Sequence, residues 1–203
     1  MSVNSRTPVV GVGLLSVVLL VAGCGTARGT GGEIAGGVNE IAADYPVYKT
    51  AEKLVDASNL IIEGEVQNSR YDVMYPMPFS GDDPELNPYA GTGNEPSDRE
   101  IADMRVPVTV YSVLVTKVHE GSATPGGMVE IHRTGGEMSG EQYVELGAAD
   151  VELGKSYLLY LDQVDGHPAG IVGGDAGLFE EVAEGTFSSA MGEIESSDVR
   201  TLK

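Results

Sequence analysis

The sequence contains a single cysteine, no tryptophan and only three phenylalanines in 203 residues. The lone cysteine, Cys24, excludes an intramolecular disulfide, so the fold must be held together by its core. Because large aromatic side chains are scarce, we expect valine, isoleucine, leucine and the nine tyrosines to supply most of the packing. The 28 glycines indicate many turns.

Basic residues are also scarce. The chain has 12 lysines and arginines against 31 aspartates and glutamates, which gives a formal net charge of −19. Nucleic acids and anionic bilayers are bound through basic surfaces, so this balance argues against a nucleic-acid partner. An acidic surface keeps a domain soluble and attracts cations or basic partners.

Catalytic motifs are missing as well. The sequence has no G-x-S-x-G, no H-E-x-x-H, no P-loop and no paired C-x-x-C. His119-Glu120 begins like a zinc-binding helix motif, but position 123 is alanine. His119, His132 and His167 are widely spaced, which favours separate surface positions over a site gathered by the fold. We therefore expect no enzymatic activity and no cofactor, with an envelope enzyme that uses an unrecognised site as the alternative.

The N-terminal region has an uncharged apolar stretch, Val9 to Val21, preceded by the cation Arg6. Its length is that of a signal-peptide core, and it is too short to span a bilayer comfortably as a helix. Small residues then lead directly to the sole cysteine. The run Val21-Ala22-Gly23-Cys24 resembles the lipobox of bacterial lipoproteins.

This resemblance implies a signal peptide over residues 1–23, cleavage before Cys24 and a diacylglyceryl group on its thiol. Two acyl chains suffice for stable anchoring, so we expect a protein lipid-anchored to the cell membrane on its extracytoplasmic face. Residues 24–44 would then be the acylated cysteine and a Gly-rich flexible linker. An ordinary secretory signal with a chance cysteine is the alternative.

Residues 45–190 show the alternation of a β domain. A helix is expected over Tyr48 to Asn59, followed by a strand over Leu60 to Val66 with Glu63 facing away from the core. The valines of Val106 to Val118 change phase near Tyr111-Ser112, which predicts a β-bulge there that turns both halves toward one core. Further strands are expected at Met128 to Arg133, Gln142 to Leu146, Ser156 to Leu161, Ala169 to Val172, Leu178 to Val182 and Thr186-Phe187. The strand Ser156 to Leu161 is apolar on both faces, which predicts a central position. The side chains expected to face the core are Ile62, Val110, Val129, Ile131 and Leu159. Residues 191–203 are predicted to be a polar C-terminal tail, helical or frayed.

These elements predict a mainly β fold: a small antiparallel OB-like barrel or sandwich with one short N-terminal helix and a long inserted loop. The stretches Ala57 to Val66, Val106 to Val118 and Leu153 to Leu161 resemble OB-like barrels of the tissue-inhibitor and netrin-module type. That resemblance implies protease inhibition as one alternative function. The animal inhibitors insert a free N-terminal cysteine into a protease zinc site, however, whereas Cys24 would be acylated.

The inserted loop, residues 68–103, holds five of the ten prolines and is rich in acids. Because it is rich in the oxygen ligands that calcium prefers, the loop is a candidate calcium site, with a disordered acidic loop as the alternative. The candidate calcium ligands are Asp82, Asp83 and Glu85. Aromatic and methionine side chains, which are enriched in recognition surfaces, gather in the same segment; the alternative is that they cap the barrel. The candidate partner-binding residues are Tyr71, Tyr75, Met77, Phe79 and Tyr89.

The sequence thus favours a membrane-anchored extracytoplasmic lipoprotein that acts as a non-catalytic binding or assembly module at the cell envelope. We expect residues 71–103 to engage an envelope protein or ligand that the sequence does not identify. The alternatives are an envelope enzyme and a protease-inhibitor-like module.

Overall fold

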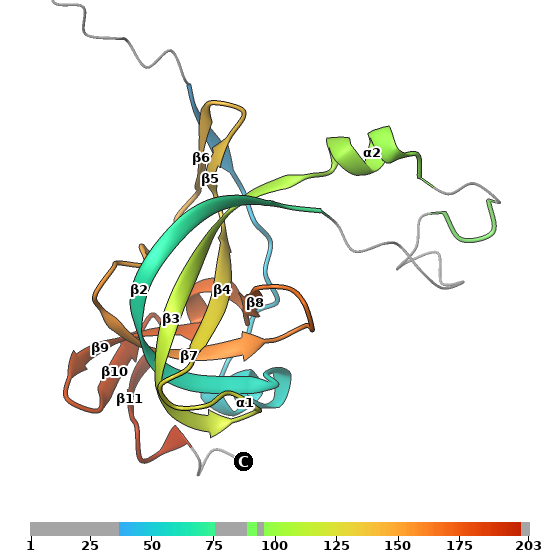
Figure 1. Ribbon diagram of the computed structural model, residues 1–203. Coiled ribbons are helices and arrows are strands. Elements are labelled where there is room, and N and C mark those ends of the chain that lie inside the picture. The colour runs from blue at the N-terminus through green and yellow to red at the C-terminus, as the bar shows by residue number, and fades with distance from the viewer. Residues whose placement is uncertain (1–36, 76–88, 93–95, 200–203) are drawn as a thin grey trace, which may run out of the picture. The chain divides into compact units, whose positions relative to one another are not determined.

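The computed structural model describes residues 37–75, 89–92 and 96–199, and within these ranges the chain is mainly β (Figure 1). The strands are β1 (Val38–Ile41), β2 (Leu60–Met74), β3 (Val106–Glu120), β4 (Met128–Thr134), β5 (Gly136–Met138), β6 (Glu141–Glu145), β7 (Ser156–Asp162), β8 (Ala169–Ile171), β9 (Leu178–Ala183), β10 (Thr186–Ser189) and β11 (Gly192–Glu195). The helices are α1 (Ala51–Ala57), α2 (Asp98–Asp103) and the 3₁₀ turn η1 (Gly174–Gly177).

Five strands form a closed ring. β2 pairs antiparallel with β7 on one side and with β3 on the other, and β3 pairs antiparallel with β4. β8 then pairs parallel with β4 and antiparallel with β7, so the order β7-β2-β3-β4-β8 returns to β7. The predicted mainly β, antiparallel, barrel-like fold is confirmed.

The remaining strands extend this ring in two directions. β9, β10 and β11 continue the sheet outward from β7 as an antiparallel meander. A separate small sheet has the order β1-β6-β5, in which β1 runs parallel to β6. In Figure 1 the β5–β6 hairpin projects from one end of the barrel, and α1 lies near the other end.

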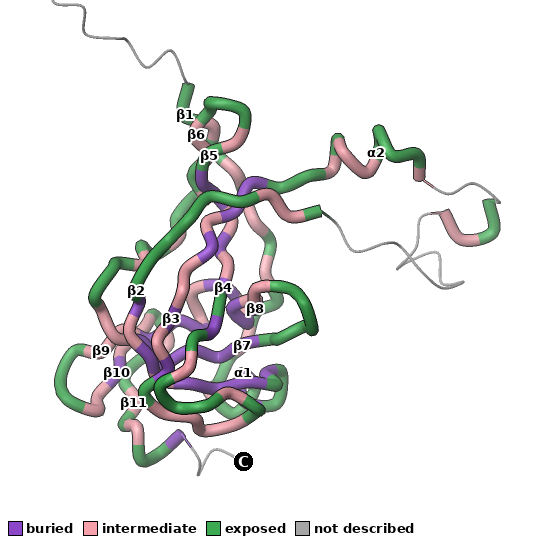
Figure 2. Tube along the Cα trace, in the orientation of Figure 1, coloured by how far each residue is buried: buried purple, intermediate pink, exposed green. Residues whose placement is uncertain are grey.

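The barrel interior is filled by one apolar core. Its members come from every strand of the ring and from β9: Leu60, Ile62, Val66, Val113, Val115, Val129, Ile131, Tyr157, Leu159, Leu161, Ala169, Ile171 and Leu178. The inward positions predicted for Ile62, Leu159, Val129 and Ile131 are confirmed. Figure 2 shows the buried residues concentrated in this part of the barrel, whereas β2 beyond it is exposed.

A second core lies on the other face of β2 and β7. There Ile61, Leu158 and Tyr160 pack with the α1 residue Leu54 and the β10 residue Phe187. Because β7 contributes alternate side chains to both cores, it is apolar on both faces, as a central strand requires. The sequence-based prediction that this strand is central is therefore correct.

β3 has no β-bulge at the predicted position, Tyr111-Ser112; its unmatched residues against β2 lie further along the strand, at Thr116 and His119. Pairing of β3 with β4 is unbroken through Tyr111 and Ser112, whereas the register of β2 against β3 shifts between Val66 and Asn68. The unmatched residue at that shift is therefore Gln67, on β2. Since β3 keeps its alternation, Tyr111 packs with Val113 against the barrel core, and Val110 is buried on the opposite face, outside both cores. The expectation that both valine phases face one core is wrong.

The insertion between β2 and β3 begins later than predicted, and its C-terminal part forms α2. β2 continues to Met74, which pairs with Val106 of β3, although the side chains of 67–72 are exposed. Backbone pairing, not apolar alternation, sustains this half of the strand. At the other end α2 begins with a capping box in which Ser97 and Glu100 bond to each other's backbone amides.

Two predicted boundaries also change. Residues 38–41 of the expected linker form β1, which is held by parallel pairing with β6. In the expected polar tail, residues 192–195 form β11, and Val199 is buried in the second core. The prediction of a helical or frayed tail over 191–203 is wrong for these residues. Burial of Val199, beyond the polar strand β11, holds this part of the chain against the second core.

Leu159→Ala should lower the free energy of unfolding by about 2–5 kcal/mol, because Leu159 is fully buried in the barrel core. Urea denaturation followed by circular dichroism measures this as a fall in the midpoint. Leu146→Ala, a matched change at an exposed leucine, should leave the midpoint almost unchanged. Equal shifts in the two variants would contradict the assigned core.

Candidate functional site

The inner face of the barrel changes from apolar to polar toward the β5–β6 end. Residues paired across adjacent strands share a face, and two such rows mark the transition. Ser69, Tyr111 and Ile131 form one row, and Tyr111 packs with the core. The next row is polar and consists of Tyr71, Thr109 and Arg133.

This polar end is a cleft of about 450 Å³, within the range of small-ligand sites. β2, β3 and β4 form its floor, β5 and β6 form one wall, and residues 148–153 form the other. We call it the tyrosine cleft, because Tyr71, Tyr111 and Tyr143 all line it.

The wall at 148–153 is fixed by a buried arginine. The Arg133 guanidinium is only 7% exposed; its Nη1 donates to the Ala149 carbonyl at 2.7 Å and its Nη2 to Asp175 Oδ1 at 2.5 Å. Asp175 Oδ2 in turn accepts from the Ala149 amide at 2.8 Å. The Glu152 amide also donates to the Tyr157 hydroxyl at 3.0 Å. These bonds tie the wall to β4, β7 and η1, so the cleft is preorganised.

The tyrosines are held at different depths. Tyr111 is half-buried, and burial, aided by the negative charge of Asp150, raises its pKa against the opposing effect of Arg133. Tyr71 is 54% exposed and lies against Gly136, where a Cβ would come within 2.9 Å of its ring and 3.0 Å of Thr109 Oγ1. Gly136 also has φ of 138°, so a side chain there would be strained as well as crowded.

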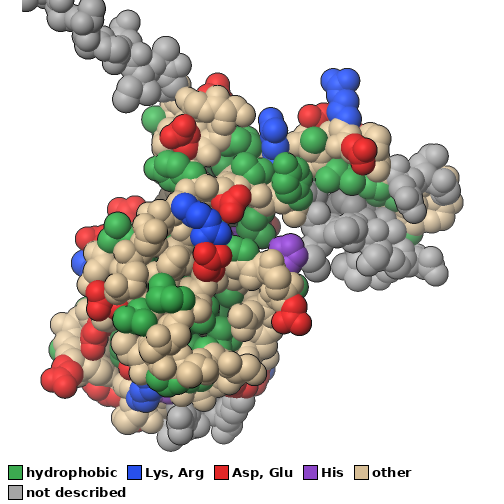
Figure 3. Space-filling view, viewed as in Figure 1, with side chains coloured by type: hydrophobic (Ala, Val, Ile, Leu, Met, Phe, Trp, Pro, Cys, Tyr) green, Lys and Arg blue, Asp and Glu red, His purple; other side chains and the backbone are tan. Residues whose placement is uncertain are grey.

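The charge of the tyrosine cleft is negative. Its lining holds Glu145, Asp150 and Glu152 against one cation, Arg133, which is already paired with Asp175. Glu145 Oε2 accepts from Tyr45 at 3.1 Å, and Glu152 lies 3.0 Å from Lys155. Figure 3 shows acidic side chains over the barrel surface and few basic ones.

Three of the predicted partner-binding residues lie within the described ranges. Tyr71 lines the tyrosine cleft. Tyr75 follows the end of β2 and is 57% exposed. Tyr89 is half-buried in a turn, where its carbonyl accepts from the Thr92 amide and hydroxyl.

The other predicted site residues lie outside the described ranges. They are the lipidation candidate Cys24, the aromatic-segment members Met77 and Phe79, and the calcium candidates Asp82, Asp83 and Glu85. Among the residues that are described, no group of three or more His, Cys, Asp or Glu side chains could hold a metal ion.

The sequence reasoning missed most of the cleft. The sequence analysis considered the valines of β3. Thr109 and Tyr111, which alternate with these valines, form part of the floor of the cleft. Tyr143 and Asp150 belong to a hairpin and loop without any motif. One signal in the sequence could have indicated the cleft: Thr109 and Tyr111 alternate along β3 with valines that are buried.

The histidines are not brought together. His132 lies beside Val110 in the register of β3 and β4, and its Nδ1 contacts the Pro168 carbonyl at 3.0 Å. His119 is nine residues further along β3, a strand distance on the order of 30 Å. His167 is exposed in the turn before β8. This placement argues against a shared site for His119 and His132.

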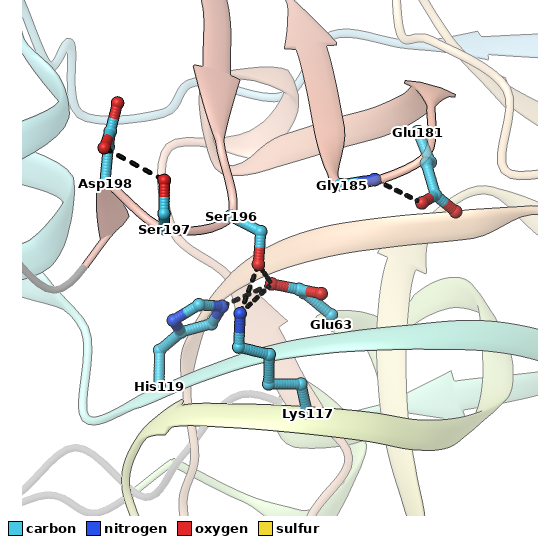
Figure 4. Close-up of polar contacts among 8 residues, drawn as sticks. All are labelled: Glu63, Lys117, His119, Glu181, Gly185, Ser196, Ser197 and Asp198. Carbon is cyan, nitrogen blue, oxygen red and sulfur yellow. Dashed lines mark hydrogen bonds and ion pairs between the residues drawn. The ribbon is translucent and has the colours of Figure 1, made fainter.

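His119 belongs instead to a polar cluster around Glu63, drawn in Figure 4. Glu63 Oε1 accepts from His119 Nε2 at 2.5 Å and from the Ser196 hydroxyl, and lies 3.3 Å from Lys117 Nζ. Lys117 also donates to Ser196. Since a carboxylate only accepts, the His119 proton is on Nε2. Glu63 is thus not a solvent-facing residue as predicted: its side chain is only 13% exposed.

The Glu63 cluster fastens the chain after β11 to the barrel. Burial raises the pKa of Glu63, but hydrogen bonds from Ser196 and His119 and the charge of Lys117 outweigh it, so the net pKa shift is downward. A carboxylate stabilised in this way is a weak base, and the Ser196 proton is directed to it rather than to the histidine. The arrangement suits a structural clamp better than nucleophilic chemistry.

Glu63→Gln should destabilise the protein at pH 7 by about 1.5–3 kcal/mol, the usual worth of hydrogen bonds to a charged group. Because the folded pKa of Glu63 lies below its unfolded value near 4.5, the contribution is present above that pH. It is lost as the pH falls through the folded pKa. Urea midpoints of wild type and Glu63→Gln should therefore converge below about pH 4.5.

Glu65→Gln, two residues along the same strand and outside the Glu63 cluster, is the matched control and should leave the urea midpoint at pH 7 almost unchanged. A constant gap between wild type and Glu63→Gln from pH 7 to pH 3 would contradict the linkage.

In the described part of the chain, no helix has the length and apolarity needed to cross a membrane. A scan against protein-family models finds no match, and a search of curated proteins finds no similar sequence.

Proposed function

We propose that this protein is a lipid-anchored lipoprotein of the extracytoplasmic membrane face, whose barrel is a non-catalytic binding module. The observation that carries the binding role is the tyrosine cleft, a preorganised hollow at one end of a closed barrel. The lipobox-like run before Cys24 supports the anchor.

In the sequence, residues 25–37 separate Cys24 from β1, and β1 pairs with β6, which lines the tyrosine cleft.

The walls of the cleft suit recognition. Backbone pairing holds the floor, and the buried Arg133–Asp175 ion pair holds the wall, so little order has to be gained when a ligand binds. Tyr71, which lines the cleft, and Tyr75, four residues further along the chain, are both exposed. The binding surface we propose therefore consists of the cleft and the base of the inserted loop.

Cys24→Ala should remove the lipid and shift the protein from the membrane fraction to the soluble or unprocessed fraction. Labelling cells with a clickable fatty acid, followed by fractionation and in-gel fluorescence, measures both effects. Gly25→Ala, a neighbouring change that keeps the thiol, should retain label and membrane association. Equal labelling of wild type and Cys24→Ala would sink the proposed anchor.

A further inference from the structure

The charges and aromatic rings of the tyrosine cleft define the class of ligand it would take. We propose that the cleft binds a basic peptide segment of a partner protein by receiving a lysine or arginine side chain between its tyrosines and carboxylates. This inference rests on the proposed binding function and deepens it.

Electrostatics favours a cationic ligand. Three carboxylates line the cleft, and the one lining cation, Arg133, has its guanidinium committed to Asp175 and Ala149. An anionic group would meet Glu145, Asp150 and Glu152 without a free basic partner among the residues that line the cleft. The net charge of −19 would also steer a basic segment toward the protein.

The aromatic side chains suit the same ligand. Ammonium and guanidinium groups are attracted to tyrosine ring faces, and Tyr71, Tyr111 and Tyr143 come from three different strands around one hollow. The Tyr143 hydroxyl is bonded to Glu141 Oε2 at 3.0 Å, which adds a fourth carboxylate next to the lining. The Tyr111 hydroxyl, like that of any tyrosine, is protonated at physiological pH and can therefore donate and accept a hydrogen bond.

A peptide fits better than a free small cation. The cleft volume of about 450 Å³ exceeds what one ammonium group fills. Val144 and Leu153 line the cleft and are both exposed, which gives the aliphatic stems of lysine or arginine an apolar surface to cover.

The test uses the full chain in detergent and fluorescein-labelled hexalysine, with binding followed by fluorescence anisotropy at physiological salt. Wild type should bind hexalysine, and should not bind the same peptide acetylated at every lysine. Tyr71→Ala should weaken binding about two- to fivefold, whereas Tyr71→Phe, which keeps the ring face, should retain it.

Asp150→Asn and Asp165→Asn form the decisive pair, because they change the net charge equally. Asp150 lines the cleft, whereas Asp165 is exposed in the turn between β7 and β8. Asp150→Asn should weaken binding by up to about fivefold, and Asp165→Asn should leave it unchanged. Thermal unfolding by circular dichroism verifies that each variant is folded.

Equal losses in both aspartate variants would overturn the inference, since binding would then follow overall charge. The inference would also be overturned if hexalysine did not bind, or if the acetylated peptide bound equally well. It would be overturned too if spermidine, a free small cation, bound and hexalysine did not. If fatty-acid labelling still depends on Cys24, these results would contradict peptide binding in the cleft but not the proposed lipid anchor. Equal fatty-acid labelling of wild type and Cys24→Ala would overturn the lipid anchor, and the hexalysine measurements would still test the cleft.

Discussion

Closure of the ring by β8 is the constraint on which the rest of the structure depends. Only three residues, Ala169–Ile171, join β4 on one side to β7 on the other. Without them, β4 and the end of β7 at Leu161 and Asp162 would be unpaired on that side, although β9 would still pair with β7 at Tyr157–Leu159.

Closure also divides the molecule into regions with separate roles. Inside the ring an apolar core gives stability, and across β2 and β7 a second core attaches α1 and the outer meander. The Glu63 cluster then holds the chain after β11 against the barrel. The polar end of the interior leaves a hollow that tyrosines and carboxylates line.

The sequence predicted the elements that alternation marks. Ser156 to Leu161 was identifiable as central because it is apolar in both phases, and Val129 and Ile131 as inward. Elements sustained by backbone pairing were not identifiable: β1, β11 and the outer half of β2 carry mostly polar side chains. A bulge was predicted at Tyr111-Ser112 because the valines change phase there, and the same change of phase results when a strand without a bulge buries residues on both of its faces. The cleft was missed for a related reason, since Arg133, Tyr143 and Asp150 meet only through pairing and the ion pair with Asp175.

The central claim is that the tyrosine cleft, rather than the acidic surface as a whole, is the binding site. The most direct measurement is a set of amide chemical-shift changes in the isotopically labelled full chain as hexalysine is added. The account predicts that the largest shifts fall on Thr109, Tyr111, Tyr143 and Asp150, which come from separate segments and meet only in the cleft. Shifts spread over exposed acids away from it, such as Asp165 and Glu184, with no maximum in the cleft, would contradict the account.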